Sequence, residues 1–277
     1  MPSEQCHTAV RDNPRQPGAV AARRYRPRPA GHRHAWPDAP SGAVGARQRQ
    51  HFNATTRPQY FTGDLAGRFV LVHLNPVSPA DLTGTYQDER FASTEAYLDW
   101  HRHFGRRHYG IDSPREHRSR FDHKQIQFIR PFGDIDLVDE RTRDDRFTNL
   151  ERIIDNKLQL ELIPYGSPTF DAGPFRRDPR LLQSHMDRLL QTIVAWPRSH
   201  IIFCGAVFEP FLKRYQVGRT QRFSLTKRDG TPARSRYRFA QLELRYEEMV
   251  VRAGLAHSYA MQGLPAEAYG REISARY

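Results

Sequence analysis

Short apolar runs separated by turn residues recur along the chain and predict an alternation of strands and helices. The run RFVLVHL at residues 68–74 is apolar and β-branched and ends at Asn75-Pro76. It predicts a central parallel strand that opens into a loop. Further strands are predicted at residues 158–163 (LQLELI), 200–204 (HIIFC) and 247–256.

Helical periodicity appears between these runs. Ser93 can cap a helix that continues to about Phe104, and residues 147–154 form a second short helical run. The clearest helix begins at Asp178-Pro179 and ends before Pro197. Its apolar positions recur at helical spacing and are Leu182, Met186, Leu189, Leu190 and Ile193. Two more helices are predicted, one after Gly205 and one beginning at Pro265.

Residues 222–239 show a different pattern, because apolar residues alternate on both sides of Asp229-Gly230. This arrangement predicts a β-hairpin. Strands that alternate with helices elsewhere imply a parallel sheet covered on both faces, with right-handed crossovers. The predicted fold is therefore α/β: a three-layer α/β/α domain with a central, mainly parallel four-stranded sheet and one added β-hairpin.

The first 56 residues show neither the helical nor the alternating spacing of apolar residues. They are rich in Pro, Arg, Ala and Gly and predict a disordered basic arm, followed by one folded domain at residues 57–277. The arm is either a tether for nucleic acid or an over-long start of the reading frame, and composition favours neither.

Charge suggests a polyanionic partner. The formal net charge is +12, and Lys and Arg gain free energy by releasing the counterions condensed on phosphate. About half of this excess lies in the arm, where nine arginines face three acidic residues. We expect DNA, duplex or single-stranded, to be the partner of a monomeric protein.

Other classes of protein lose support. No apolar run approaches the ~20 residues that span a bilayer, and no secretory signal opens the chain, so we expect a cytoplasmic protein without a membrane partner. Cys6 and Cys204 are the two cysteines, too few for a disulfide framework or a four-cysteine metal cluster. No G-x-S-x-G, P-loop or G-x-G-x-x-G motif is present. We therefore expect no cofactor and no metal.

The segments that follow the strands hold the candidate chemistry, because ligands of such sheets bind beyond the carboxyl ends of the strands. The segments are residues 73–79 (HLNPVSP), 164–169 (PYGSPT), Gly205 and residues 257–264 (HSYAMQGL). They carry a carboxamide, hydroxyls, a phenol and an imidazole, which suit recognition of a heterocycle.

These residues resemble the uracil-DNA glycosylase superfamily. VLVHLNP looks like its first motif, IIFCGAVFEPFL like its penultimate strand and helix, and LAHSYAMQGLPAEAYG like its second motif. The resemblance spans about residues 68–273, in motifs of a few residues each. It implies hydrolysis of the N-glycosidic bond of a damaged or modified base, by a divergent member.

The resemblance also implies site roles. Asn75 would hold water or the sugar, and His257 would face the departing base. The base would be contacted by Tyr165 or Ser167, in a site completed by His73, Pro76, Gly205 and Ser258. Met261 and Leu264 are candidates for the wedge that enters the duplex. From its charge alone, the hairpin turn with Lys227, Arg228 and Arg234 would clamp the DNA backbone, and a solvated basic face is the alternative.

Departures from the superfamily pattern leave two other functions open. Val77 stands where one branch has Gly, the Asp-Pro-Tyr sequence of another branch is missing, and two cysteines cannot build an iron–sulfur cluster. One alternative is a non-catalytic nucleic-acid-binding module of the same fold. The other is a hydrolase or transferase acting on nucleosides.

Two polar stretches allow more than one interpretation. The first contains His101, His103, His108, His117 and His123 among arginines, and it suits either phosphate contact with aromatic stacking or a metal site. The second contains Asp134, Asp136, Asp139 and Glu140, and it suits either a metal or general-base site or a solvated loop.

Overall fold

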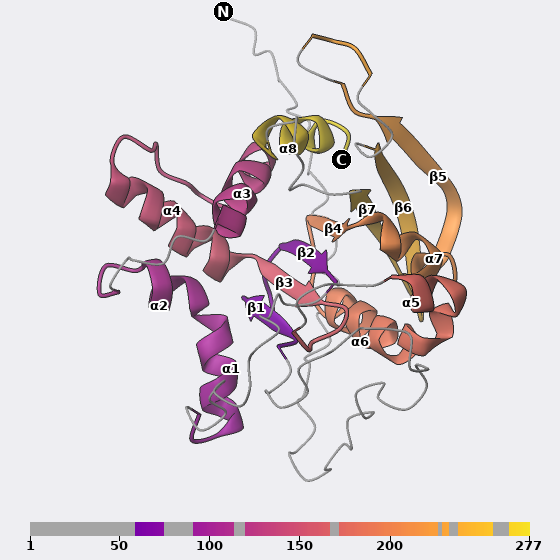
Figure 1. Cartoon of the computed structure of the whole chain (residues 1–277), viewed down its shortest axis with the longest axis horizontal. Helices are drawn as coiled ribbons and strands as arrows, with labels where there is room; N and C mark the ends of the chain where they lie inside the picture. Colours follow the sequence, from indigo (N-terminus) through magenta and orange to yellow (C-terminus); the bar gives the residue numbers. More distant parts are fainter. Residues whose placement is uncertain are drawn as a thin grey trace, which may run out of the picture. The chain divides into compact units, whose positions relative to one another are not determined.

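The computed structural model describes residues 59–74, 91–113, 120–166, 172–226, 229–232, 238–256 and 266–277 (Figure 1). The predicted basic arm at residues 1–56 lies outside them and stays a prediction. The strands are β1 (Phe61–Gly63), β2 (Phe69–His73), β3 (Leu158–Glu161), β4 (His200–Cys204), β5 (Gln216–Ser224), β6 (Arg238–Tyr246) and β7 (Met249–Ala256).

Eight α-helices and three short 3₁₀ helices fall within the described ranges. The α-helices are α1 (Thr94–Arg102), α2 (Phe104–Tyr109), α3 (Arg120–Ile129), α4 (Arg143–Asn156), α5 (Gly173–Arg177), α6 (Gln183–Val194), α7 (Glu209–Leu212) and α8 (Ala266–Ser274). The 3₁₀ helices are η2 (Arg130–Phe132), η3 (Pro179–Leu182) and η4 (Ala206–Phe208). Along the described chain, no helix is both long and apolar enough to cross a bilayer.

All seven strands form one mixed sheet in the order β1-β3-β2-β4-β7-β6-β5. Its centre is parallel, since β2 pairs in parallel with both β3 and β4, and β4 pairs in parallel with β7. The four strands predicted from the apolar runs are these four, so the α/β class and the parallel centre are confirmed.

The sheet is larger than predicted. The hairpin expected around Asp229-Gly230 exists as β5 and β6, but β6 also pairs antiparallel with β7. A tight turn at Glu247, whose φ is 53°, joins β6 to β7. The hairpin therefore continues the main sheet. On the opposite edge, β1 pairs antiparallel with β3, and its three residues are too few to show a period.

Helices cover both faces of the sheet (Figure 1). On one face, here called the α6 face, Val70 and Val72 of β2 pack in a cluster with residues of α5, α6 and α7. On the other, here called the α4 face, Phe69 and Leu71 pack in a second cluster with residues of α2, α3, α4 and α8. Alternate side chains of one strand point to opposite faces, which explains this division.

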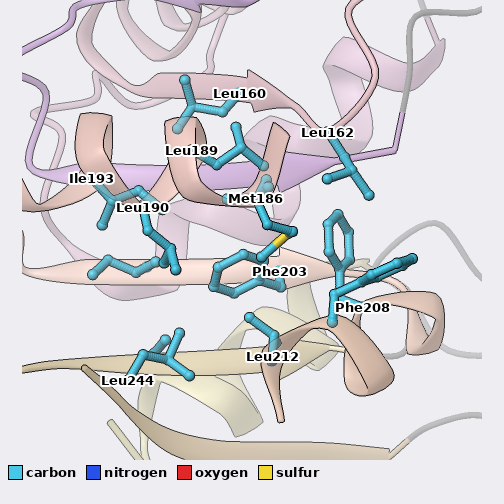
Figure 2. Packing of buried hydrophobic residues seen from close by; sticks show 14 of the residues in the cluster. Leu160, Leu162, Met186, Leu189, Leu190, Ile193, Phe203, Phe208, Leu212 and Leu244 are labelled. Atoms are coloured by element: carbon cyan, nitrogen blue, oxygen red, sulfur yellow. The ribbon is translucent and has the colours of Figure 1, made fainter. Parts of the chain in front are cut away.

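The α6 face shows how the helical pattern becomes a core (Figure 2). All five apolar positions predicted for the helix after Asp178-Pro179 are buried. In Figure 2 the side chain of Met186 lies over Phe203 of β4, and Leu190, Phe208 and Leu212 belong to the same cluster. The cluster fixes α6 and the end of β4 against each other.

Local capping explains where two helices begin. The Ser93 side chain accepts a hydrogen bond from the Ala96 amide, as predicted for α1. Thr142 and Asp145 form a reciprocal capping box, so α4 begins four residues earlier than its apolar pattern suggested. The sequence interpretation missed α2 and α3 within the His- and Arg-rich stretch.

Candidate functional site

The four parallel strands end in one row at the carboxyl edge of the sheet. Val72 of β2 lies opposite Phe203 of β4, and Phe203 lies opposite Leu255 of β7. One residue further along, His73 pairs with Glu161 of β3, and Cys204 pairs with Ala256. The chain therefore leaves β2 and β7 at the same edge, with β4 between them and about 10 Å from one to the other at the usual strand spacing.

Three of the predicted site residues are described. His73 is the last residue of β2 and is buried on the α4 face. The centroid of its ring lies 5.4 Å from that of Phe121 in α3. Tyr165 packs partly buried against the cluster of the α6 face. Gly205 follows β4 directly. His73 and Tyr165 thus lie at the same edge but pack against different faces.

The other predicted site residues lie outside the described residues. They are Asn75, Pro76, Ser167, Lys227, Arg228, Arg234, His257, Ser258, Met261 and Leu264. Their positions stay predictions. The strand ends that precede Asn75 and His257 are described, and both lie in the row given above.

Gly205 has a conformational reason to be glycine. Its φ is 134°, a region that side chains with a Cβ rarely adopt. A Cβ there would meet only Val207, at 3.7 Å, so space is not the constraint. The Gly205 amide donates to the Ala256 carbonyl at 2.7 Å, which joins the end of β4 to the end of β7.

A row of polar side chains crosses the α4 face beneath this edge, beside Phe69, Leu71 and His73 of the neighbouring strand β2. Lys157, Gln159 and Glu161 are all buried, and Lys157 is fully so. Lys157 Nζ donates to Gln159 Oε1 at 3.0 Å, and Gln159 Nε2 donates to Glu161 Oε1 at 2.8 Å. From α3, Gln125 Nε2 donates to the same Gln159 oxygen at 3.2 Å. These four residues are called the polar ladder below.

The ladder fixes which way each group faces. A lysine ammonium only donates, so the Gln159 atom next to Lys157 must be the amide oxygen. The Gln159 nitrogen then faces Glu161, whose Oε1 must accept. The remaining Glu161 oxygen, Oε2, is buried and has no hydrogen-bond partner among the described residues, and the same is true of Gln125 Oε1.

Burial shifts the pKa values in and beside the ladder. It raises the pKa of Glu161 from 4.5 to about 8, against the lowering effects of the Gln159 hydrogen bond and the Lys157 charge. It lowers the pKa of Lys157 to about 8. Burial and then the Lys157 charge lower the pKa of His73 to about 3. At neutral pH, Glu161 therefore carries a proton and the imidazole of His73 is neutral.

Three further groups surround the ladder. The Tyr109 hydroxyl donates to Asp122 of α3, which lies one helical turn before Gln125. Cys204 lies half-buried at the end of β4, and burial raises the pKa of its thiol, helped by the nearby Glu161. Helix α3 thus covers the ladder, and the edge of the sheet holds a neutral imidazole, a neutral thiol and a carboxylic acid.

Sequence reasoning missed the ladder although a signal was present. In LQLEL, polar residues occupy every second position of a strand that was predicted to be buried on both faces. Such a strand in a parallel sheet is normally apolar throughout. The alternation indicated either an exposed face or a buried polar site, and the structure shows the second.

The carboxylates at residues 134–140 lie in ion pairs. Each of them lies beside a cationic or ionisable partner: Asp134 beside His200, Asp136 beside Arg152, Asp139 beside Arg141, and Glu140 beside Arg130 and Arg146. Among the residues that the structure describes, no three His, Cys, Asp or Glu side chains gather closely enough to hold a metal ion. These carboxylates act in ion pairs.

The His- and Arg-rich stretch is divided between helices. His101 is buried against Tyr97, with ring centroids 4.4 Å apart, and burial lowers its pKa to about 4. Arg107 pairs with Asp99 at 2.6 Å and lies over the Trp100 ring. His117 lies outside the described residues. His101 is therefore a residue of the folded interior. Phosphate contact by the other histidines of this stretch stays a prediction.

Comparison with known proteins adds no relative: no protein-family model, curated protein or solved structure matches this chain. The resemblance to uracil-DNA glycosylases therefore rests on the short motifs alone.

Proposed function

We propose that this protein is a DNA-binding, glycosylase-like enzyme of the three-layer α/β/α type, which hydrolyses the N-glycosidic bond of a damaged or modified base. The observation that supports the proposal is the common row of the β2 and β7 ends. The chain leaves both strands at one edge, and the two residues that the resemblance implicates, Asn75 and His257, follow these strand ends in the sequence.

The chemistry needs two groups on opposite sides of one bond. A base must leave the stack before its glycosidic bond is accessible, which costs a few kcal/mol and requires a fitting site. Positive charge then develops on the sugar and negative charge on the base. In this proposal Asn75 positions water near the sugar, and His257 stabilises the departing base with a preorganised dipole.

Charge and burial are consistent with this assignment. The chain carries a net charge of +12, which favours the phosphate backbone as a partner. The neutral imidazole of His73 and the acid of Glu161 are buried at the same edge, which suits contact with an uncharged heterocycle better than with a phosphate.

The test uses the full-length chain and duplexes that each carry one uracil, hypoxanthine, 8-oxoguanine or mispaired adenine. Excision is read as alkali-labile strand breaks under single-turnover conditions. We expect cleavage at one or more of these bases, and a loss of at least 100-fold for Asn75→Ala and for His257→Ala. Each variant is checked for a wild-type melting temperature.

Three results would contradict the proposal in different ways. Cleavage that survives both substitutions would refute the site. DNA retention with a steep salt dependence but no abasic product would select the non-catalytic binding module. Hydrolysis of free nucleosides without affinity for duplex DNA would select the nucleoside-directed enzyme.

A further inference from the structure

Glu161 Oε2 is an unusual atom in this protein. It belongs to a side chain that is 4% exposed, it lies at the end of β3 opposite His73, and it has no hydrogen-bond partner among the described residues. A buried polar oxygen without a partner costs free energy. At a strand end, such an oxygen is suited to contact a ligand group.

The hydrogen bonds of the polar ladder determine which oxygen of Glu161 carries the acid proton. Gln159 Nε2 donates to Glu161 Oε1, so a proton on Oε1 would meet the N–H group of Gln159. The proton of the neutral acid must therefore reside on Oε2. Lys157 and Gln125 hold the Gln159 oxygen from two sides, which prevents the amide from reversing and keeps this assignment fixed.

From this geometry we propose that Glu161 is a catalytic general acid, which protonates the departing base through Oε2, and that Gln159 is its positioning residue. The inference rests on the proposed function. It specifies the substrate as a base with a ring nitrogen that accepts a proton, as in a purine, instead of one that departs readily as an anion.

The step balances as follows. The bond between C1′ of the sugar and the base nitrogen breaks, and its electron pair goes to the base. Oε2–H delivers its proton to a ring nitrogen of the base, leaving the Glu161 carboxylate. Water attacks C1′ and loses a proton, which returns Glu161 to its acid form. The products are the free neutral base and a sugar with a hydroxyl group at C1′.

The surroundings of Glu161 favour its acid form at neutral pH. The titratable groups that face it are Lys157, which directly precedes β3, His73 from β2 and Cys204 from β4. Asp122 from α3 acts on Lys157 instead. Burial has the largest effect and raises the pKa of Glu161 to about 8, although the Lys157 charge opposes this. A general acid works best when its pKa is close to the working pH.

The experiment measures single-turnover excision from pH 5.5 to 9.5 with the full-length wild type and Glu161→Gln. The duplexes carry hypoxanthine, mispaired adenine or uracil. Glutamine keeps the oxygen that faces Gln159 but has no acid proton. For purines we expect the wild-type rate to fall as pH rises through about 8. Glu161→Gln should lower the purine rate at least 100-fold and remove this decline.

Two further variants separate catalysis from folding. Asp122→Asn alters another buried carboxyl group of the α4 face, one that already accepts from Tyr109, and should keep the decline near pH 8. Gln159→Leu removes a hydrogen bond that lowers the pKa of Glu161. It should therefore move the decline to higher pH, which a merely structural role would not do. Thermal unfolding verifies that each variant is folded.

The outcomes separate this inference from the proposed function. If bases are excised and Glu161→Gln stays within threefold of wild type with an unchanged pH profile, Glu161 is not the acid and the proposed function stands. If uracil alone is excised, the substrate class is wrong. If nothing is excised, calorimetry with free adenine tests whether Glu161 still acts as an acid toward a bound base. If adenine binds with uptake of a proton and Glu161→Gln abolishes this binding, Glu161 is an acid site but the protein is not a glycosylase. If adenine does not bind, both the proposed function and the role of Glu161 are wrong.

Discussion

Glu161→Gln should flatten the dependence of stability on pH, because a buried acid holds its proton more tightly in the folded state than in the unfolded chain. Burial raises the pKa of Glu161 from 4.5 to about 8. The stability that Glu161 contributes is therefore complete below pH 4.5 and is lost as pH rises through about 8. A change of this size corresponds to about 5 kcal/mol of unfolding free energy.

The variant cannot lose this contribution, since glutamine does not ionise. The free energy of unfolding of Glu161→Gln minus that of wild type should therefore rise between pH 5 and pH 8. Of the ideal value, about 3.5 kcal/mol falls between pH 5 and pH 8. Relaxation of the surroundings reduces it, and we expect a rise of about 2–3 kcal/mol.

Urea unfolding at constant ionic strength, followed by fluorescence at half-unit pH intervals, measures this difference. Glu267→Gln is the control, because Glu267 lies exposed in an ion pair with Arg271. Its difference from wild type should stay constant within about 0.5 kcal/mol. If the Glu161→Gln difference changes by less than about 1 kcal/mol over this range, the acid of Glu161 is not held protonated, and the reasoning on the polar ladder is wrong.

Three further predictions concern packing and the ladder. Gly270→Ala should lower the unfolding free energy by about 1–3 kcal/mol in urea titration, because a Cβ would lie 2.1 Å from the Phe128 carbonyl oxygen. Arg271 is exposed on the same helix, and Arg271→Ala should change the unfolding free energy by less than about 0.5 kcal/mol. Phe203→Ala should cost about 3–5 kcal/mol and lower the melting temperature by about 10 °C in calorimetry, since it empties the centre of the α6-face cluster. Lys157→Met should leave stability at pH 7 unchanged or raise it by up to about 3 kcal/mol, because burial lowers the Lys157 pKa from 10.5 to about 8; a loss above 1 kcal/mol would contradict this cause.

Most parts of the fold that the sequence predicted bury mainly apolar positions, and β3 is the exception, since it buries Gln159 and Glu161. The run that forms β2, the run that forms β4 and the helical spacing of α6 all follow the periods that a hydrophobic core imposes. Parallel pairing of β2, β3, β4 and β7 then follows from the intervening helices. These features are local in sequence, which is why one chain sufficed to predict them.

Helix α3, the longest missed element, has the opposite property. Helix α3 buries Asp122 and Gln125 beside Ile126, Phe128 and Ile129, so its inward face looks half polar in the sequence. A hydrophobic pattern treats such positions as exposed. Asp122 accepts a hydrogen bond from Tyr109 of α2, and the partner of Gln125, Gln159, lies 34 residues further along the chain. No local pattern could supply that contact.

Buried polar residues made both helix α3 and the polar ladder hard to predict from the sequence, and there is a physical reason why the two occur together. Leucine at positions 159 and 161 would extend the apolar surface that Phe69 and Leu71 of β2 form on the same face. Replacing buried ionic groups by apolar ones is often neutral or stabilising. The ladder is therefore poorly explained by stability alone. Strongly shifted pKa values gather at functional sites, and here they gather at the carboxyl edge of a parallel sheet, where such folds bind their ligands.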